Sequence, residues 1–169
     1  MSNLFNQKVL EDQMEDYKIE DFENKFSIIE GWQRNLEGIK GVNEVGLQGA
    51  FLQGIFGNIL NYINLTAADE NGDYSLKSEP STEVDATNPD GSLGVFNTAE
   101  DLDDDTLAVI ELKGPKVSLD KKQKRDGKDY GTPVEQAFRY ATKHDGCKWV
   151  IVSNMIEIRL YKYERGQGY

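Results

Sequence analysis

Histidine, cysteine and proline are scarce in this chain of 169 residues, which has one histidine, one cysteine and four prolines. A single cysteine excludes an internal disulfide framework, and one cysteine with one histidine excludes zinc sites built from several such ligands. Long apolar runs are also missing, so no segment is expected to cross a membrane. The opening residues, MSNLFNQKVLED, lack the basic and apolar segments of a signal peptide. These absences predict a cytoplasmic protein that makes no membrane contact.

Positive charge is scarce overall, because the net charge is -11. Such a balance disfavours a nucleic-acid-binding protein, which usually shows a basic surface. The distribution is uneven, however. Residues 67–105 hold one basic and 12 acidic groups, whereas residues 113–148 hold 10 basic and 5 acidic groups. The second segment forms either a local basic face that binds phosphate or a solvated surface.

The spacing of apolar residues predicts helices in the first part of the chain. Residues 4–30 fit one or two amphipathic helices with charged outer faces. Residues 31–42 contain three glycines and fit a loop or a short helical turn. Residues 43–63 give the strongest helical pattern, with Asn43 as the N-cap.

From about residue 72 the spacing of apolar residues changes to that of β-strands. Strands are expected at residues 74–79, 93–96 and 107–112. The third of these, LAVIEL, is apolar almost throughout and fits a strand buried on both faces. A helix follows, with Thr132 as N-cap, Pro133 at its first position and Glu135 completing a capping box.

We expect this helix to close at Gly146, and a hairpin of residues 149–152 and 156–163 to follow, turning at residues 153–154. The order of elements predicts an α/β domain of two or three layers, with a mixed central β-sheet flanked by helices.

Glu111 and Lys113 are two residues apart at the end of the third strand, so both side chains point to one face. Burial of two charged groups is unfavourable unless they pair or serve a function, and an ion pair between them is the simpler interpretation. An antiparallel hairpin that turns between residues 100 and 101 places Asp90 opposite Glu111. Asp90, which follows a proline and precedes a glycine, can also be an ordinary turn residue.

Carboxylates that face each other across neighbouring strands repel unless a cation lies between them. Mg²⁺ takes oxygen ligands and keeps positions for water and phosphate. We therefore expect a metal site formed by Asp90, Glu111 and the backbone carbonyl of Leu112. Lys113 would orient or deprotonate the attacking water and stabilise negative charge in the transition state.

Asp90, preceded by proline, and Glu111-x-Lys113 together resemble the PD-(D/E)xK nuclease motif. Gln136 and Tyr140, one helical turn apart on one face, resemble the QxxxY element of restriction enzymes of type I and of the fused type IIG and type ISP kind.

The wider sequence, over about residues 43–163, resembles the N-terminal nuclease domain of single-chain restriction–methyltransferase enzymes. Residues 1–42 would then be a helical extension of a single nuclease domain spanning residues 1–169. The resemblance implies a restriction-endonuclease-like core and cleavage of double-stranded DNA with Mg²⁺, for which Mn²⁺ can substitute. Two copies would pair transiently to cut both strands.

The resemblance also implies roles for further residues. Gln136 and Tyr140 would hold the lysine or contact the DNA backbone beside the metal. Glu44, on the first helix of the core, would assist the metal; the alternative is a favourable interaction with the helix N-terminus.

No methyltransferase signature such as N-P-P-[YF] occurs in the chain, and it stops at ERGQGY without an obvious end to its fold. We therefore expect a fragment of a longer multidomain enzyme, whose methyltransferase and target-recognition domains lie elsewhere. S-adenosylmethionine would bind only in such a domain. Two alternatives stay open: a non-catalytic nucleic-acid-binding or assembly module on the same fold, and the nuclease part of a type I-style motor subunit.

Overall fold

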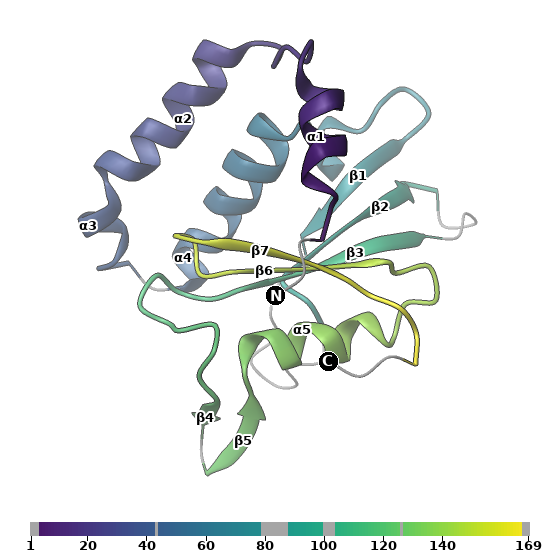
Figure 1. Ribbon diagram of the computed structural model, residues 1–169. Helices are drawn as coiled ribbons and strands as arrows, with labels where there is room; N and C mark the ends of the chain where they lie inside the picture. Colours follow the sequence, from purple (N-terminus) through teal and green to yellow (C-terminus); the bar gives the residue numbers. More distant parts are fainter. Residues whose placement is uncertain (1–3, 43, 79–87, 100–103, 126, 167–169) are drawn as a thin grey trace.

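A computed structural model describes residues 4–42, 44–78, 88–99, 104–125 and 127–166 (Figure 1). The helices are α1 (Gln7–Met14), α2 (Phe22–Arg34), α3 (Leu36–Ile39), α4 (Glu44–Phe51), the π-helix η1 (Leu52–Ile59), the 3-10 helix η2 (Leu65–Ala67) and α5 (Pro133–Ala141). The strands are β1 (Asp73–Ser78), β2 (Gly91–Asn97), β3 (Asp105–Leu112), β4 (Gln123–Arg125), β5 (Lys128–Gly131), β6 (Trp149–Ser153) and β7 (Ile158–Lys162).

Five strands form the central sheet, in the order β1-β2-β3-β6-β7. Strands β3 and β6 are parallel and the other neighbours are antiparallel, so the sheet is mixed, as predicted. Helices α2 and α4 lie over one face and α5 lies over the other (Figure 1). The described residues therefore form a three-layer α/β arrangement. No helix among them is long and apolar enough to span a bilayer.

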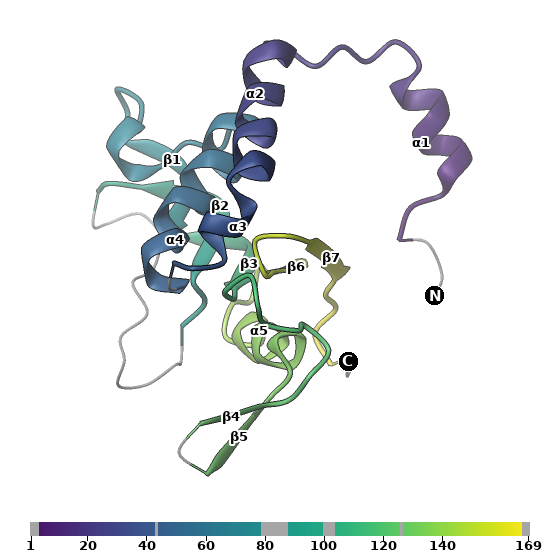
Figure 2. The same cartoon turned by 90° about the vertical axis from the view of Figure 1, so that its left-hand side faces the viewer.

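The N-terminal segment forms helices, as predicted, but their boundaries differ. Helix α2 continues to Arg34, inside the segment for which a loop was expected, and α3 supplies the expected short turn. Neither α1 nor α2 contains a buried residue. The indole N–H of Trp32 donates to the carbonyl of Met155 at 2.8 Å, which ties α2 to the end of β6. Helix α1 lies apart from the other helices (Figure 2).

The long helix predicted over residues 43–63 ends earlier, at Ile59, and its second half is a π-helix. The amide of Leu60 bonds to the carbonyl of Ile55, five residues back, at 3.0 Å. The predicted N-cap, Asn43, lies outside the described residues. The apolar face of this helix packs on the sheet through Phe51, Leu52 and Phe56.

Strand β3 is buried on both faces, as its apolar sequence predicted. Ala108, Ile110 and Leu112 pack in the core on the α4 side, whereas Val109 packs in the core on the α5 side. Side chains alternate along a strand, so Glu111 shares the α5 side with Val109.

The capping box at the start of α5 is confirmed. The Thr132 hydroxyl accepts from the amide of Glu135 at 3.1 Å, and the Glu135 carboxylate accepts from the amide of Thr132 at 2.6 Å. The prediction that Gly146 closes this helix is wrong, because α5 ends at Ala141. A Cβ at Gly146 would lie 2.0 Å from the side chain of Asp105, so this glycine allows a close approach to β3.

The basic connection after β3 also differs from expectation. A loop with one helical turn was expected, and the structure has the antiparallel hairpin β4–β5. Its strands are too short and too polar to show an alternating apolar pattern in the sequence. The expected C-terminal hairpin is confirmed as β6 and β7, although β7 begins two residues later than predicted.

Candidate active site

Asp90 lies directly before β2 and is 8% exposed. The register of β2 with β3 pairs Gly91 with Ile110 and Ser92 with Val109, which continues to Asp90 opposite Glu111, as predicted. The Asp90 carboxylate accepts a hydrogen bond from the amide of Leu112 at 2.6 Å. Asp90 therefore joins the start of β2 to the end of β3.

Burial raises the pKa of Asp90 to about 6, although the hydrogen bond from the Leu112 amide and the charge of Lys113 oppose the rise. The nearby charge of Glu44 adds to it. Asp90 is therefore close to half protonated near pH 6.

Glu111 and Lys113 form an ion pair, the simpler of the two interpretations of these residues, with 2.5 Å between the Lys113 ammonium and a Glu111 oxygen. The Glu111 side chain is 3% exposed and that of Lys113 is 14% exposed. Burial raises the pKa of Glu111 to about 8, against the lowering effect of Lys113. The negative charges of Asp90 and Glu44 raise it further.

Burial by itself would lower the pKa of the Lys113 ammonium. The negative charges of Glu111, Glu44 and Asp90 together outweigh that effect and raise the pKa above its usual value. Lys113 is therefore cationic at neutral pH.

Glu44 begins α4, and its carboxylate accepts from the amide of Gly114 at 2.6 Å. This bond ties the N-terminus of α4 to the residue that follows Lys113. A carboxylate in the first turn also interacts favourably with the helix dipole. The two interpretations of Glu44 are thus compatible, since the residue lies at a helix N-terminus and beside the other candidate residues.

Gln136 and Tyr140 are both 6% exposed and lie on the face of α5 that packs toward the sheet. Burial raises the pKa of Tyr140 to about 12, and the charge of Glu111 adds to the rise. The amide nitrogen of Gln136 is buried and has no hydrogen-bond partner among the described residues. The structure therefore brings the aspartate, glutamate, lysine and tyrosine expected from the sequence into electrostatic contact, with Gln136 one helical turn before the tyrosine.

Leu112 was expected to contribute its backbone carbonyl to a metal. Its amide donates to Asp90, and its side chain is fully buried on the α4 side. The role of the carbonyl stays a prediction.

Two further residues belong to this region and were not singled out from the sequence. The Gln48 amide donates to the Asp90 carboxylate at 3.1 Å and to its backbone carbonyl at 3.3 Å. Gln48 lies one turn after Glu44 on α4, a spacing that the helical period could have revealed. The buried hydroxyl of Ser92 has no hydrogen-bond partner among the described residues. Ser92 lies two residues after Asp90, on the same face of the strand.

The donor set fits Mg²⁺. No group of three or more histidine, cysteine, aspartate or glutamate residues able to hold a metal occurs in the described part of the chain. Mg²⁺ does not require such a group, because it keeps several waters and is commonly held by one or two carboxylates. Asp90 and Glu111 supply two. Once both are ionised, they and Glu44 outnumber the nearby cation Lys113, and a divalent ion would offset that excess of negative charge.

Two cavities lie away from these residues. One of about 580 Å³ is lined by apolar residues that include Phe56, Trp149 and Leu160, and one of about 400 Å³ lies between α2 and the start of β7. Neither is lined by the buried carboxylates, so the candidate site is defined by its side chains and their charge.

Comparisons with models of protein families, with curated proteins and with solved structures found no match for this chain. A functional interpretation therefore depends on the site itself and on the sequence motifs that led to it.

Proposed function

We propose that this chain is a Mg²⁺-dependent endonuclease domain that hydrolyses phosphodiester bonds of double-stranded DNA on a restriction-endonuclease-like PD-(D/E)xK core. One observation carries the proposal. Asp90 and Glu111 are buried together where β2 begins and β3 ends, with the half-buried Lys113 and Tyr140 of α5 beside them. So many charged groups at one buried point are costly for a fold unless they serve a function.

Asp90 and Glu111 are the residues that would hold Mg²⁺. The ion would supply Lewis-acid polarisation of the phosphate and of a bound water. In its absence the two carboxyl groups hold protons more tightly than usual, since burial raises the pKa of each.

Lys113 serves best as a fixed positive charge. Its raised pKa makes proton abstraction from water unfavourable and makes stabilisation of negative charge on phosphate oxygens favourable. Of the two roles expected from the sequence, the structure favours charge stabilisation.

Tyr140 and Gln136 complete the site from α5. With its raised pKa, the Tyr140 phenol keeps its proton and can donate a hydrogen bond. The Gln136 amide has buried N–H donors without a partner in the described residues. Because such donors are costly to leave unpaired, a phosphate or water oxygen is the natural acceptor.

We propose further that this domain belongs to a cytoplasmic restriction–modification enzyme. Methyltransferase and target-recognition domains would lie outside these 169 residues, and S-adenosylmethionine would bind only there. Two copies would pair transiently on DNA to cut both strands, since one site cuts one strand.

A second candidate function is a non-catalytic nucleic-acid-binding or assembly module. The short ion pair between Glu111 and Lys113 favours it, because each charge already has a partner. This candidate predicts no saturable Mg²⁺ or Mn²⁺ site. The nuclease part of a type I-style motor subunit would share the proposed chemistry, and the neighbouring domains would distinguish it.

The decisive experiment is nicking of supercoiled plasmid with Mn²⁺ or with EDTA, by the wild type, Lys113→Ala and the exposed-lysine control Lys18→Ala. We expect metal-dependent nicking by the wild type and the control, and none by Lys113→Ala. If none of the three proteins nicks DNA, a titration with Mn²⁺ shows whether the protein has a saturable metal site and so distinguishes the two candidate functions. A site abolished by Glu111→Gln supports the nuclease, and no site supports the binding module.

A further inference from the structure

The β4–β5 hairpin connects two parts of the candidate site. The chain leaves β3 at Lys113, forms the hairpin, and enters α5 only a few residues before Gln136. In both views the hairpin projects from the body of the domain (Figures 1 and 2). The hairpin is therefore an arm whose two ends are fixed at the residues proposed to act on phosphate.

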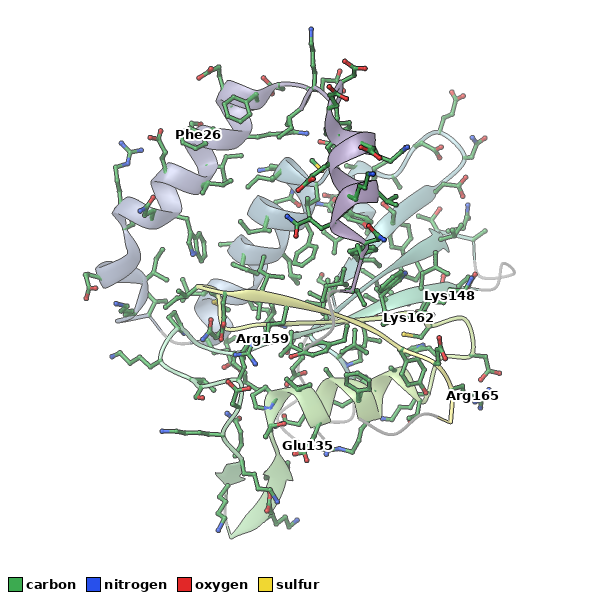
Figure 3. All side chains as sticks on the ribbon, viewed as in Figure 1. Phe26, Glu135, Lys148, Arg159, Lys162 and Arg165 are labelled. Carbon is green, nitrogen blue, oxygen red and sulfur yellow. The ribbon has the colours of Figure 1, made fainter. Side chains whose placement is uncertain are left out.

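Side chains from the body hold the base of this arm. The guanidinium of Arg159, labelled in Figure 3, donates to both carboxylate oxygens of Asp120 at 2.7 and 2.9 Å. At the other end, Arg139 donates to the carbonyl of Tyr130. Gly131 has a φ of 75°, and a Cβ there would lie 2.6 Å from a carboxylate oxygen. These contacts set the direction in which the arm leaves the domain.

The arm carries exposed positive charge. Lys124 and Lys128 of the hairpin and Lys121, two residues before β4, are exposed, and within the described part of the chain none of them forms an ion pair. Lys122 does form one, with Asp129 at 3.5 Å. A two-stranded hairpin contributes little stability by itself, and none of the described residues of this one belongs to either core cluster. Packing against the core therefore does not explain why the hairpin is present, whereas a role in binding a partner does.

We propose that the β4–β5 hairpin, together with Lys121 just before it, is a DNA-contacting arm, in which Lys121, Lys124 and Lys128 bind phosphates of duplex DNA beside the bond to be cleaved. This inference rests on the proposed nuclease function. Lysine binds phosphate as a point charge, and a two-stranded β-ribbon fits the major groove of duplex DNA. The chain as a whole is strongly negative and repels DNA, so attraction is concentrated on the arm.

Binding of a fluorescent duplex of about 20 base pairs, measured by anisotropy in EDTA between about 50 and 200 mM salt, tests the arm. The test variant combines Lys121→Ala, Lys124→Ala and Lys128→Ala. The control combines Lys8→Ala, Lys18→Ala and Lys148→Ala, which remove the same charge from exposed lysines outside the hairpin. Figure 3 shows Lys148 at the right of the domain, away from the arm.

We expect the arm variant to bind at least tenfold more weakly than the control at the lowest salt. The slope of log affinity against log salt concentration should be smaller in magnitude by about 2–3, since each lost phosphate contact reduces that slope by about 0.9. Equal affinity and slope in the two variants would overturn the proposal, as would failure of the wild type to bind duplex DNA. So would an equal or larger loss on the corresponding single strand, because the arm would then not be specific for the duplex.

Because these measurements contain no divalent metal, they separate the arm from the nuclease. Arm-dependent binding without metal-dependent nicking would retain the arm and reject the nuclease. Nicking without arm-dependent binding would retain the nuclease and reject the arm.

Discussion

The carboxylate of Asp90 accepts a hydrogen bond from the backbone amide of Leu112 at 2.6 Å. The bond spans 22 residues of sequence and fixes the start of β2 against the end of β3. The other carboxylate oxygen accepts from the side-chain amide of Gln48 at 3.1 Å. The same group that would hold a metal therefore also holds the two strands together.

Replacement of Asp90 should separate these two roles. Asp90→Ala leaves the Leu112 amide without its acceptor and should lower the free energy of unfolding by about 1–3 kcal/mol. Asp90→Asn keeps an acceptor and buries no charge, so at neutral pH its free energy of unfolding should equal or exceed that of the wild type. Both variants should lose at least about a hundredfold in Mn²⁺-dependent nicking, because Asn lacks the negative charge. Chemical denaturation and plasmid nicking measure the two effects, with Asp16→Asn as an exposed control. Wild-type nicking by Asp90→Asn would contradict the proposed role.

The buried carboxyl groups should make the metal-free protein less stable as the pH rises. The pKa of Asp90 is raised to about 6 and that of Glu111 to about 8. A group with a raised pKa in the folded state stabilises the fold fully below its unfolded pKa and loses that contribution as pH rises through its folded pKa. The free energy of unfolding should therefore fall between about pH 4 and pH 8, by roughly 1.4 kcal/mol for each unit of pKa shift.

Urea denaturation at a series of pH values in EDTA measures this loss. General repulsion among the many acidic groups has the same sign, so the variant Glu111→Gln is needed to isolate the site. It should flatten the curve between about pH 5 and pH 8, whereas the exposed control Glu30→Gln should not. A Glu111→Gln curve parallel to that of the wild type would show that the pKa of Glu111 is not raised.

The sequence predicted the register of this site because turn chemistry and burial agree. Pro89 and Gly91 flank Asp90 and restrict where β2 can begin, and the acidic segment before β3 restricts where the turn can fall. The pairing of Gly91 with Ile110 follows that register, and the ladder shifts only after Leu93, beside Gly94. At Gly94 a Cβ would lie 2.0 Å from the carbonyl of Asp105, so the bulge requires glycine.

Other features could not be predicted in this way. The contact of Gln48 with Asp90 spans 42 residues and depends on how α4 crosses the sheet. The β4–β5 hairpin has polar strands of three and four residues, whose pairing leaves no apolar alternation. Helix η1 contacts α2 and the sheet, and the apolar period of the sequence does not distinguish its π-helical bonds from those of an α-helix.

Binding of a divalent metal should depend on pH in the opposite direction to stability. Metal must displace protons from Asp90 and Glu111, whose pKa values are raised to about 6 and about 8. Between pH 6 and pH 8 the affinity for Mn²⁺ should rise on the order of 10- to 100-fold, with release of protons. Saturating metal, at about 100 times its Kd, should stabilise the fold by about 2.7 kcal/mol, and EDTA should reverse this.

Calorimetric titration in two buffers with different ionisation enthalpies measures both the affinity and the protons released. The variant Glu111→Gln should lose the saturable site, and Glu30→Gln should keep it. An affinity that does not change between pH 6 and pH 8 would show that the metal binds away from the buried carboxyl groups.

Because the Gln136 amide is unpaired, replacement of this residue should maintain or raise stability and lower activity. Its buried nitrogen lacks a hydrogen-bond partner within the described structure, a condition that typically costs about 1–3 kcal/mol. Gln136→Leu has a similar volume and no polar atoms, so its free energy of unfolding should equal or exceed that of the wild type. If the amide binds a phosphate or water oxygen during cleavage, the same variant should nick plasmid at least about tenfold more slowly. Denaturation and nicking assays on Gln136→Leu, with exposed Gln33→Leu as the control, measure both effects. Higher stability with unchanged nicking would show that Gln136 takes no part in cleavage.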